Sequence, residues 1–196
     1  FDKDDTHAGR FNKADGSTID VDYMSQEGDF YYTMHEDYSA VELPYGDSAF
    51  SMVAILPSQN STVDTFIEAF DQETWNDRDE WSSPQVTVVL PKFKYGFKSL
   101  LNDPLSNLGL GIAFTDDADF SGITEETELY ISRVIHQSFI DVMEEGTEAA
   151  AATIVEVRET SMGNYINFNR PFLYLIKENS TGAIMFMGKV GAPEYK

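Results

Sequence analysis

Apolar residues in this chain recur mainly at every second position, in short runs separated by polar residues and turns. This alternation is typical of β-strands with one face buried and the other exposed. Strands of this kind are expected at residues 18–23, 30–34, 39–43, 85–90 and 92–95. The chain is therefore predicted to be rich in β-structure.

Further apolar stretches predict strands in the interior. Residues 50–56 (FSMVAIL) form a nearly continuous apolar run that ends at Pro57, which indicates a strand buried on both faces. Near the C-terminus, the apolar residues 171–176 and 183–187 flank a polar turn at 177–182 and are expected to form a buried hairpin.

The longest predicted strand covers residues 129–143 (LYISRVIHQSFIDVM). Its length of about 15 residues exceeds the 3–10 that are usual for strands. A strand of this length needs a large sheet on which to lie.

Helical periodicity is confined to two places. Residues 61–70 predict a helix whose N-terminus Ser61 or Thr62 can cap, and residues 99–110 predict a short, broken one. Residues 71–83 are polar and are expected to form a loop. The apolar side chains of the first helix fall on one face: Val63, Phe66, Ile67 and Phe70.

The segment 144–161 (EEGTEAAAATIVEVRETS) fits two structures. Its four alanines, 149–152, are the best helix formers, whereas residues 153–157 alternate and are β-branched, which suits a strand. The residue pattern by itself leaves both structures open.

Length, composition and charge exclude several classes of protein. The 196 residues, 42% of them apolar, suit a globular unit of one domain or somewhat more. With 34 acidic residues against 13 basic ones, the net charge of −21 disfavours nucleic acid and anionic membranes as partners. There is no cysteine to form a disulfide, and no apolar run approaches the ~18 residues of a membrane-spanning helix.

The sequence contains none of the common motifs of catalytic or cofactor-binding residues. The three histidines, His7, His35 and His136, lack the spacing of a zinc site, and there is no nucleophile elbow, P-loop or dinucleotide fingerprint. The acidic residues 116–119 (DDAD) lack the spacing of a calcium loop, so a solvated loop is favoured over a calcium site. We therefore expect no catalytic residues, no metal and no cofactor.

The C-terminal residues 168–176 (FNRPFLYLI) and 182–190 (GAIMFMGKV) resemble the closing signature of the serpins, serine-protease inhibitors that act by conformational change. Other stretches resemble the family in the same order along the chain. They are residues 1–6 (FDKDDT), 41–45 (VELPY), 50–52 (FSM), 56–57 (LP), 90–92 (LPK), 120–122 (FSG), 132–136 (SRVIH) and 145–150 (EGTEAA).

The resemblance implies the multi-domain α+β fold of the serpins, of which residues 1–196 match the C-terminal portion of a single serpin domain. This portion is mostly β, with strands of three sheets and a few short helices. The N-terminal half is not in this chain and is expected as a partner, so the 196 residues alone are not expected to fold cooperatively. The resemblance also implies an extracellular or cell-surface location.

In the family, an exposed reactive loop, here about residues 145–165, is bait for a protease. After cleavage the loop inserts into the central sheet as a strand and traps the protease as a covalent acyl complex. Gly146 begins the hinge, and alternate side chains of the loop must enter a packed interior without overpacking it. The inward set is Thr147, Ala149, Ala151 and Thr153, all small, and the outward set is Glu148, Ala150 and Ala152.

Family spacing sets the reactive bond between Thr160 and Ser161, fourteen residues after Gly146. Thr160 suits elastase-like or subtilisin-like proteases, which have shallow apolar first pockets. Arg158 is the alternative, since a trypsin-like protease would cleave after it. A non-inhibitory serpin acting as a binding or chaperone module is a further alternative, although the small hinge residues favour an inhibitor.

Three other residues match family positions that control opening of the central sheet. Glu144 matches the glutamate of the "breach", Lys92 matches its lysine partner, and His136 matches the histidine of the "shutter". A partly buried Glu144–Lys92 pair is expected to hold the sheet closed until the loop arrives. The closed fold is expected to be metastable, so cleavage of the loop raises its thermal stability.

Overall fold

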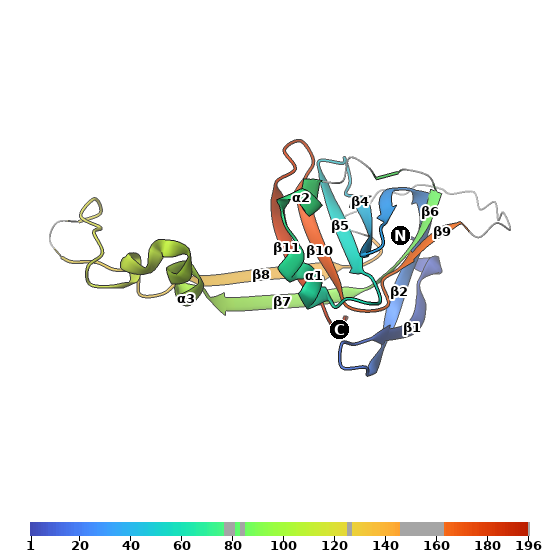
Figure 1. Ribbon diagram of the computed structural model, residues 1–196, viewed down its shortest axis with the longest axis horizontal. Coiled ribbons are helices and arrows are strands. Elements are labelled where there is room, and N and C mark those ends of the chain that lie inside the picture. The colour runs from blue at the N-terminus through green and yellow to red at the C-terminus, as the bar shows by residue number, and fades with distance from the viewer. Residues whose placement is uncertain (77–80, 83–84, 125–126, 146–162, 196) are drawn as a thin grey trace. The chain divides into compact units, whose positions relative to one another are not determined.

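The computed structural model describes residues 1–76, 81–82, 85–124, 127–145 and 163–195. The chain divides into two compact units (Figure 1). The first consists of Phe1–Phe93 and Val142–Lys196, and the second of Lys94–Asp141.

A five-stranded antiparallel sheet with the order β11-β10-β5-β4-β3 forms much of the first unit. Its middle strand β5 is buried from Ser51 to Pro57, because its continuous apolar run can face packed residues on both sides. The strands are β3 (Tyr31–Met34), β4 (Tyr38–Pro44), β5 (Phe50–Pro57), β10 (Phe172–Glu178) and β11 (Ile184–Val190).

The predicted C-terminal hairpin is confirmed, but only β10 is buried. Leu175 of β10 pairs with Met187 of β11, and their strands run antiparallel. β11 lies at the edge of the sheet, so Met185, Phe186 and Met187 remain exposed to solvent.

Two helices contribute to the core of this sheet. α1 (Val63–Ala69) contacts β5 and β10, and Thr62 caps it by accepting a hydrogen bond from the Thr65 amide at 3.1 Å. This confirms the predicted helix, but the loop predicted at 71–83 contains a second helix, α2 (Gln72–Asn76). The buried core cluster includes Tyr38, Ala40, Val53, Ile55, Val63, Phe66, Trp75, Leu173 and Leu175.

A four-stranded sheet with the order β1-β2-β6-β9 completes the first unit. β1 (His7–Asn12), β2 (Thr18–Asp29) and β6 (Gln85–Pro91) are antiparallel, and a short 3-10 helix, η1 (Lys3–Asp5), precedes them. His7 is the first residue of β1. β9 (Asn164–Asn167) runs parallel to β6, with Ile166 opposite Val88 and both side chains buried.

The second unit contains a two-stranded sheet of β7 (Phe93–Leu100) and β8 (Ile135–Val142). Between these strands lie three short helical turns. They are α3 (Asn102–Leu105), the π-helical turn η3 (Ser106–Leu110) with Gly109 at φ 99°, and the 3-10 helix η4 (Gly111–Phe114).

The predicted strand 129–143 is wrong in its first half, since β8 begins only at Ile135. The preceding backbone bonds to the helical turns instead of to a strand. Ile131 N donates to Ala113 O at 2.9 Å, and Val134 N donates to Asn102 Oδ1 at 2.9 Å. These partners use backbone groups that pairing with a neighbouring strand would need.

Candidate functional site

Glu144 and Lys92 form an ion pair at the C-terminal end of β8. Lys92 Nζ lies 2.9 Å from Glu144 Oε2 and 3.1 Å from Oε1. Thr6 Oγ1 donates a third hydrogen bond to Glu144 Oε1, at 2.7 Å. Only 6% of the Glu144 side chain and 16% of the Lys92 side chain are exposed, so water screens this pair poorly.

The surroundings strongly favour the charged form of Glu144. Burial alone would raise its pKa, but hydrogen bonds from Thr6 and from its own backbone act against burial, as do the hydrogen bond and positive charge of Lys92. Together they lower the pKa of Glu144 to about 2.

Three separate parts of the chain bring these groups together. Lys92 lies between β6 and β7, and its backbone N donates to Asp22 O on β2 at 2.8 Å. Thr6 follows η1, whose last turn it caps with an N–H to the Lys3 carbonyl at 3.2 Å. The register of the four-stranded sheet thus fixes where the Lys92 side chain begins.

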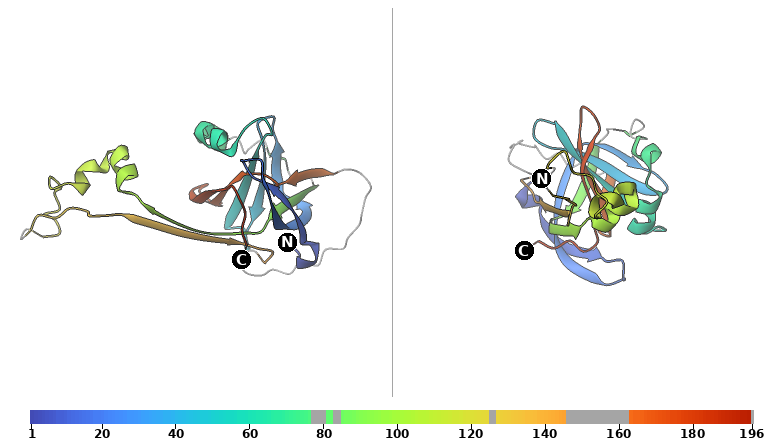
Figure 2. Two further views of the ribbon diagram at one scale, coloured as in Figure 1. Left: turned by 90° about the horizontal axis from the view of Figure 1, so that it is seen from below. Right: turned by 90° about the vertical axis from the view of Figure 1, so that its left-hand side faces the viewer.

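The C-terminal segment reaches the same place. Lys92 Nζ lies 4.6 Å from the centre of the Tyr195 ring, and the Tyr195 hydroxyl donates to Met143 Sδ at 3.2 Å. In Figure 2, the N and C labels of both termini lie at the first unit. Sequence reasoning did not identify Thr6 or Tyr195, because neither lies in a periodic pattern that points to Lys92. We call Thr6, Lys92, Met143, Glu144 and Tyr195 the closing cluster.

Most of the predicted reactive loop lies outside the described residues. This applies to the hinge 146–153, to Arg158 and to the Thr160–Ser161 bond. The structure does describe what stands at its two ends. Glu145, immediately after the closing cluster, is ion-paired with Lys3, and Asn164 begins β9 beside β6.

Nearly the whole chain matches one protein family. The model of that family, described as "Serpin (serine protease inhibitor)", matches residues 1–193. The chain belongs to the serpin family.

Similarity to individual proteins supports the same family. A "Serine protease inhibitor" of Cyanea capillata is 37% identical over 98% of this chain and 53% of the relative. A human "Leukocyte elastase inhibitor" is 34% identical over 94% of this chain and 51% of the relative. The crystal structure of the thermophilic serpin tengpin in its native state superimposes with a TM-score of 0.85 at 33% sequence identity. The match covers 98% of this chain and 51% of the tengpin chain. This serpin chain thus spans about half the length of these relatives, and the predicted α+β fold with three sheets is confirmed.

His136, the predicted shutter histidine, lies on β8 with its side chain exposed. Its ring is 6.4 Å from that of Phe97 on β7. A hydrogen bond from His136 across the central sheet of the serpin fold stays a prediction.

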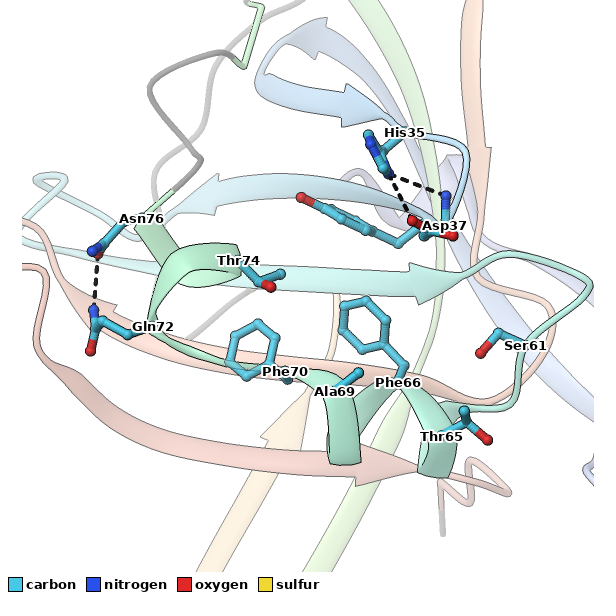
Figure 3. Close-up of a pocket in the computed structure, with 11 residues that line it drawn as sticks. His35, Asp37, Ser61, Thr65, Phe66, Ala69, Phe70, Gln72, Thr74 and Asn76 are labelled. Atoms are coloured by element: carbon cyan, nitrogen blue, oxygen red, sulfur yellow. Dashed lines mark hydrogen bonds and ion pairs between the residues drawn. The ribbon is translucent and has the colours of Figure 1, made fainter.

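A cavity of about 860 Å³ in the described part of the chain is lined by none of the predicted site residues. It lies between α1, α2 and the turn from β3 to β4 (Figure 3). Its rim carries the His35–Asp37 pair, 3.5 Å apart, and the hydrogen bond from Gln72 Nε2 to Asn76 Oδ1 at 2.9 Å. Phe66 and Phe70 give it an apolar wall that continues into the core cluster.

Metal ligands do not gather in the part of the serpin that the structure describes. No group of three or more histidine, aspartate or glutamate side chains there could hold a metal ion. In the acidic stretch 116–119, Asp119 accepts the Ser121 amide at 3.0 Å, and hydrogen bonds from Ser121 lower its pKa. No helix of the described residues is long and apolar enough to cross a membrane.

Proposed function

We propose that this chain is the C-terminal half of an inhibitory serpin domain, a suicide inhibitor of serine proteases with no catalytic residues or cofactor of its own. The main support for this proposal is the position of the buried Lys92–Glu144 pair, directly before the small-residue hinge that starts at Gly146. A hinge that follows a closed, ion-paired strand end can insert only when that end opens, which couples cleavage to conformational change.

The N-terminal half of the fold is the first partner that this proposal requires. The relatives are about twice as long as this chain, and large apolar side chains such as Phe97, Phe139 and Met187 are exposed. Apolar surface of this kind is normally covered. We call this chain joined to that N-terminal half the complete inhibitor.

The target protease is the second partner, met outside the cell or at its surface. Its serine oxygen attacks the carbonyl carbon of Thr160, the bond to Ser161 breaks, and the Ser161 nitrogen takes up a proton as a new N-terminus. The protease then remains bound to Thr160 as an ester. Insertion of residues 147–160 into the central sheet carries the protease along before water can attack this ester.

The hinge residues fit this insertion physically. The inward side chains of Thr147, Ala149, Ala151 and Thr153 are small. They would enter a packed sheet without the ~1–3 kcal/mol that overpacking typically costs at each position. Outward-facing Glu148 stays hydrated. The small inward side chains also argue against a non-inhibitory binding or chaperone module, because a loop that never inserts into a sheet does not need small side chains.

Thr160 favours an elastase-like or subtilisin-like target, and a relative of this chain is named as an inhibitor of leukocyte elastase. The test is incubation of the complete inhibitor with elastase, subtilisin or trypsin, followed by a denaturing gel and mass spectrometry. We expect a covalent band with elastase or subtilisin and a released peptide that begins at Ser161. A peptide beginning at Glu159 would instead assign the reactive bond to Arg158, and cleavage without a covalent band would assign a non-inhibitory serpin.

A further inference from the structure

The Lys92 ammonium group is enclosed by two different kinds of neighbour. Two of its three N–H donors reach the Glu144 carboxylate oxygens, at 2.9 and 3.1 Å. The Tyr195 ring lies over the same nitrogen, 4.6 Å away. The face of an aromatic ring attracts a cation within about 6 Å. The ring thus holds the Lys92 ammonium group by electrostatic attraction as well as by van der Waals contact.

Tyr195 is itself fixed to the strand end that carries Glu144. Its hydroxyl donates to the sulfur of Met143, the residue directly before Glu144. The buried Pro193 and the buried Val190 at the end of β11 secure the segment that leads to it. One side chain at the C-terminus therefore contacts both sides of the closing cluster: Lys92 directly, and Glu144 through Met143.

We propose that Tyr195 is a positioning residue that holds Lys92 against Glu144 and so keeps the end of β8 closed before cleavage. This inference rests on the proposed function, because closure matters only if the hinge inserts there. The role belongs to the aromatic ring. A leucine would cover Lys92 from water but would not attract its charge, whereas phenylalanine and tryptophan would do both.

Loss of the ring leaves Lys92 free to turn toward solvent, where an ion pair contributes little. The closed state then becomes less stable relative to the inserted state. The complete inhibitor should therefore lose activity faster on warming in the absence of protease, by spontaneous insertion of its uncleaved loop. Acylation by the protease, which depends on the bait residues, should keep its rate constant.

The experiment compares Tyr195→Leu, Tyr195→Phe and Tyr195→Trp in the complete inhibitor, with Glu194→Ala as a control in the same exposed segment. We expect Tyr195→Leu to shorten the half-life of activity about threefold to tenfold, and the other three variants to stay within about twofold of the parent. In a Lys92→Met background, Tyr195→Leu should have no further effect. An unchanged half-life in Tyr195→Leu, equal effects of leucine and phenylalanine, or a full effect without Lys92 would each overturn the proposal.

If Tyr195→Leu does not fold, a second measurement on the unsubstituted protein tests whether the Tyr195 ring lies over the Lys92 nitrogen. The lysines are reductively methylated with a 13C label, and the signal lost in Lys92→Met identifies Lys92. A ring above its nitrogen predicts an upfield shift that disappears on unfolding, and the absence of this shift contradicts the proposal. This readout needs no protease. A complete inhibitor that traps no protease would therefore overturn the proposed function while leaving the contact itself testable.

Discussion

Lys92 Nζ lies 2.9 Å from Glu144 Oε2, at the point where β8 ends and the predicted hinge begins. Lys92 belongs to the connection between β6 and β7, so this one contact joins the residues that follow β8 to the four-stranded sheet of the same unit. Because both side chains are largely buried, removal of one partner leaves the other with an unpaired, poorly hydrated charge.

Lys92→Met should therefore lower the free energy of unfolding of the complete inhibitor by about 3 kcal/mol, measured by urea titration. Thr6→Val removes only the hydroxyl donor and should have a smaller effect, about 1–2 kcal/mol. The double variant Lys92→Met/Glu144→Gln should be more stable than Lys92→Met alone, since the unpaired charge is gone. If the losses of unfolding free energy in Lys92→Met and Glu144→Gln add up to the loss in the double variant, the two residues do not act as a unit.

The depressed pKa of Glu144 predicts a pH dependence. The folded value of about 2 lies below the ordinary 4.5, so the pair stabilises the fold above pH 4.5, and this contribution disappears as the pH falls from about 4.5 to about 2. At neutral pH its size is about 3 kcal/mol. The stability difference between the parent and Glu144→Gln should shrink across this window. Glu178 also has a pKa of about 2, but it is present in both proteins, so its contribution cancels.

The direction of the hinge side chains can be tested by placing one bulky charge at neighbouring positions. Thr147→Arg puts the charge into the inward set, where burying it should slow insertion at least about tenfold. More of each inhibitor molecule would then be cleaved as substrate, and the ratio of inhibitor consumed to protease trapped should rise. Glu148→Arg, on the outward face, should leave this ratio near that of the parent. Equal ratios in the two variants would contradict the predicted alternation.

A glycine of the closing signature offers a test of packing. Gly188 on β11 pairs with Tyr174 on β10, and a Cβ at position 188 would lie 2.5 Å from the Tyr174 hydroxyl oxygen. Gly188→Ala should therefore destabilise the fold by about 1–3 kcal/mol in urea titration. Gly191→Ala is the matched control, because a Cβ there meets no atom within 4 Å. Equal stabilities of the two variants would refute this account of the hairpin.

The isolated chain of 196 residues should unfold without a single sharp transition. In the part that the structure describes, β8 pairs only with β7, and both strands expose apolar side chains such as Phe97 and Phe139. Circular dichroism reports the whole chain, whereas the tryptophan fluorescence of Trp75 and Trp81 reports the five-stranded sheet. The two urea transitions should not coincide. Coincident, sharp transitions would mean that this half folds alone as a cooperative unit.

The alternation of apolar residues predicted most strands, since each buries one face or both, and the expected cap at Ser61 or Thr62 located α1, which Thr62 caps. It failed at residues 129–134, because the side-chain pattern does not reveal that the backbone there bonds to helical turns instead of to a strand. The Lys92–Glu144 pair was predicted through resemblance to a family. Thr6 and Tyr195 could not be predicted, because contacts between segments remote in the sequence leave no local signal.

Amide hydrogen exchange of residues 147–157 in the complete inhibitor, before and after cleavage of the loop, tests the central claim most directly. Insertion as a strand gives these backbone N–H groups partners in the sheet. They should exchange rapidly before cleavage and become strongly protected after it, together with a large rise in melting temperature. Rapid exchange that persists after cleavage, with an unchanged melting temperature, would contradict the account.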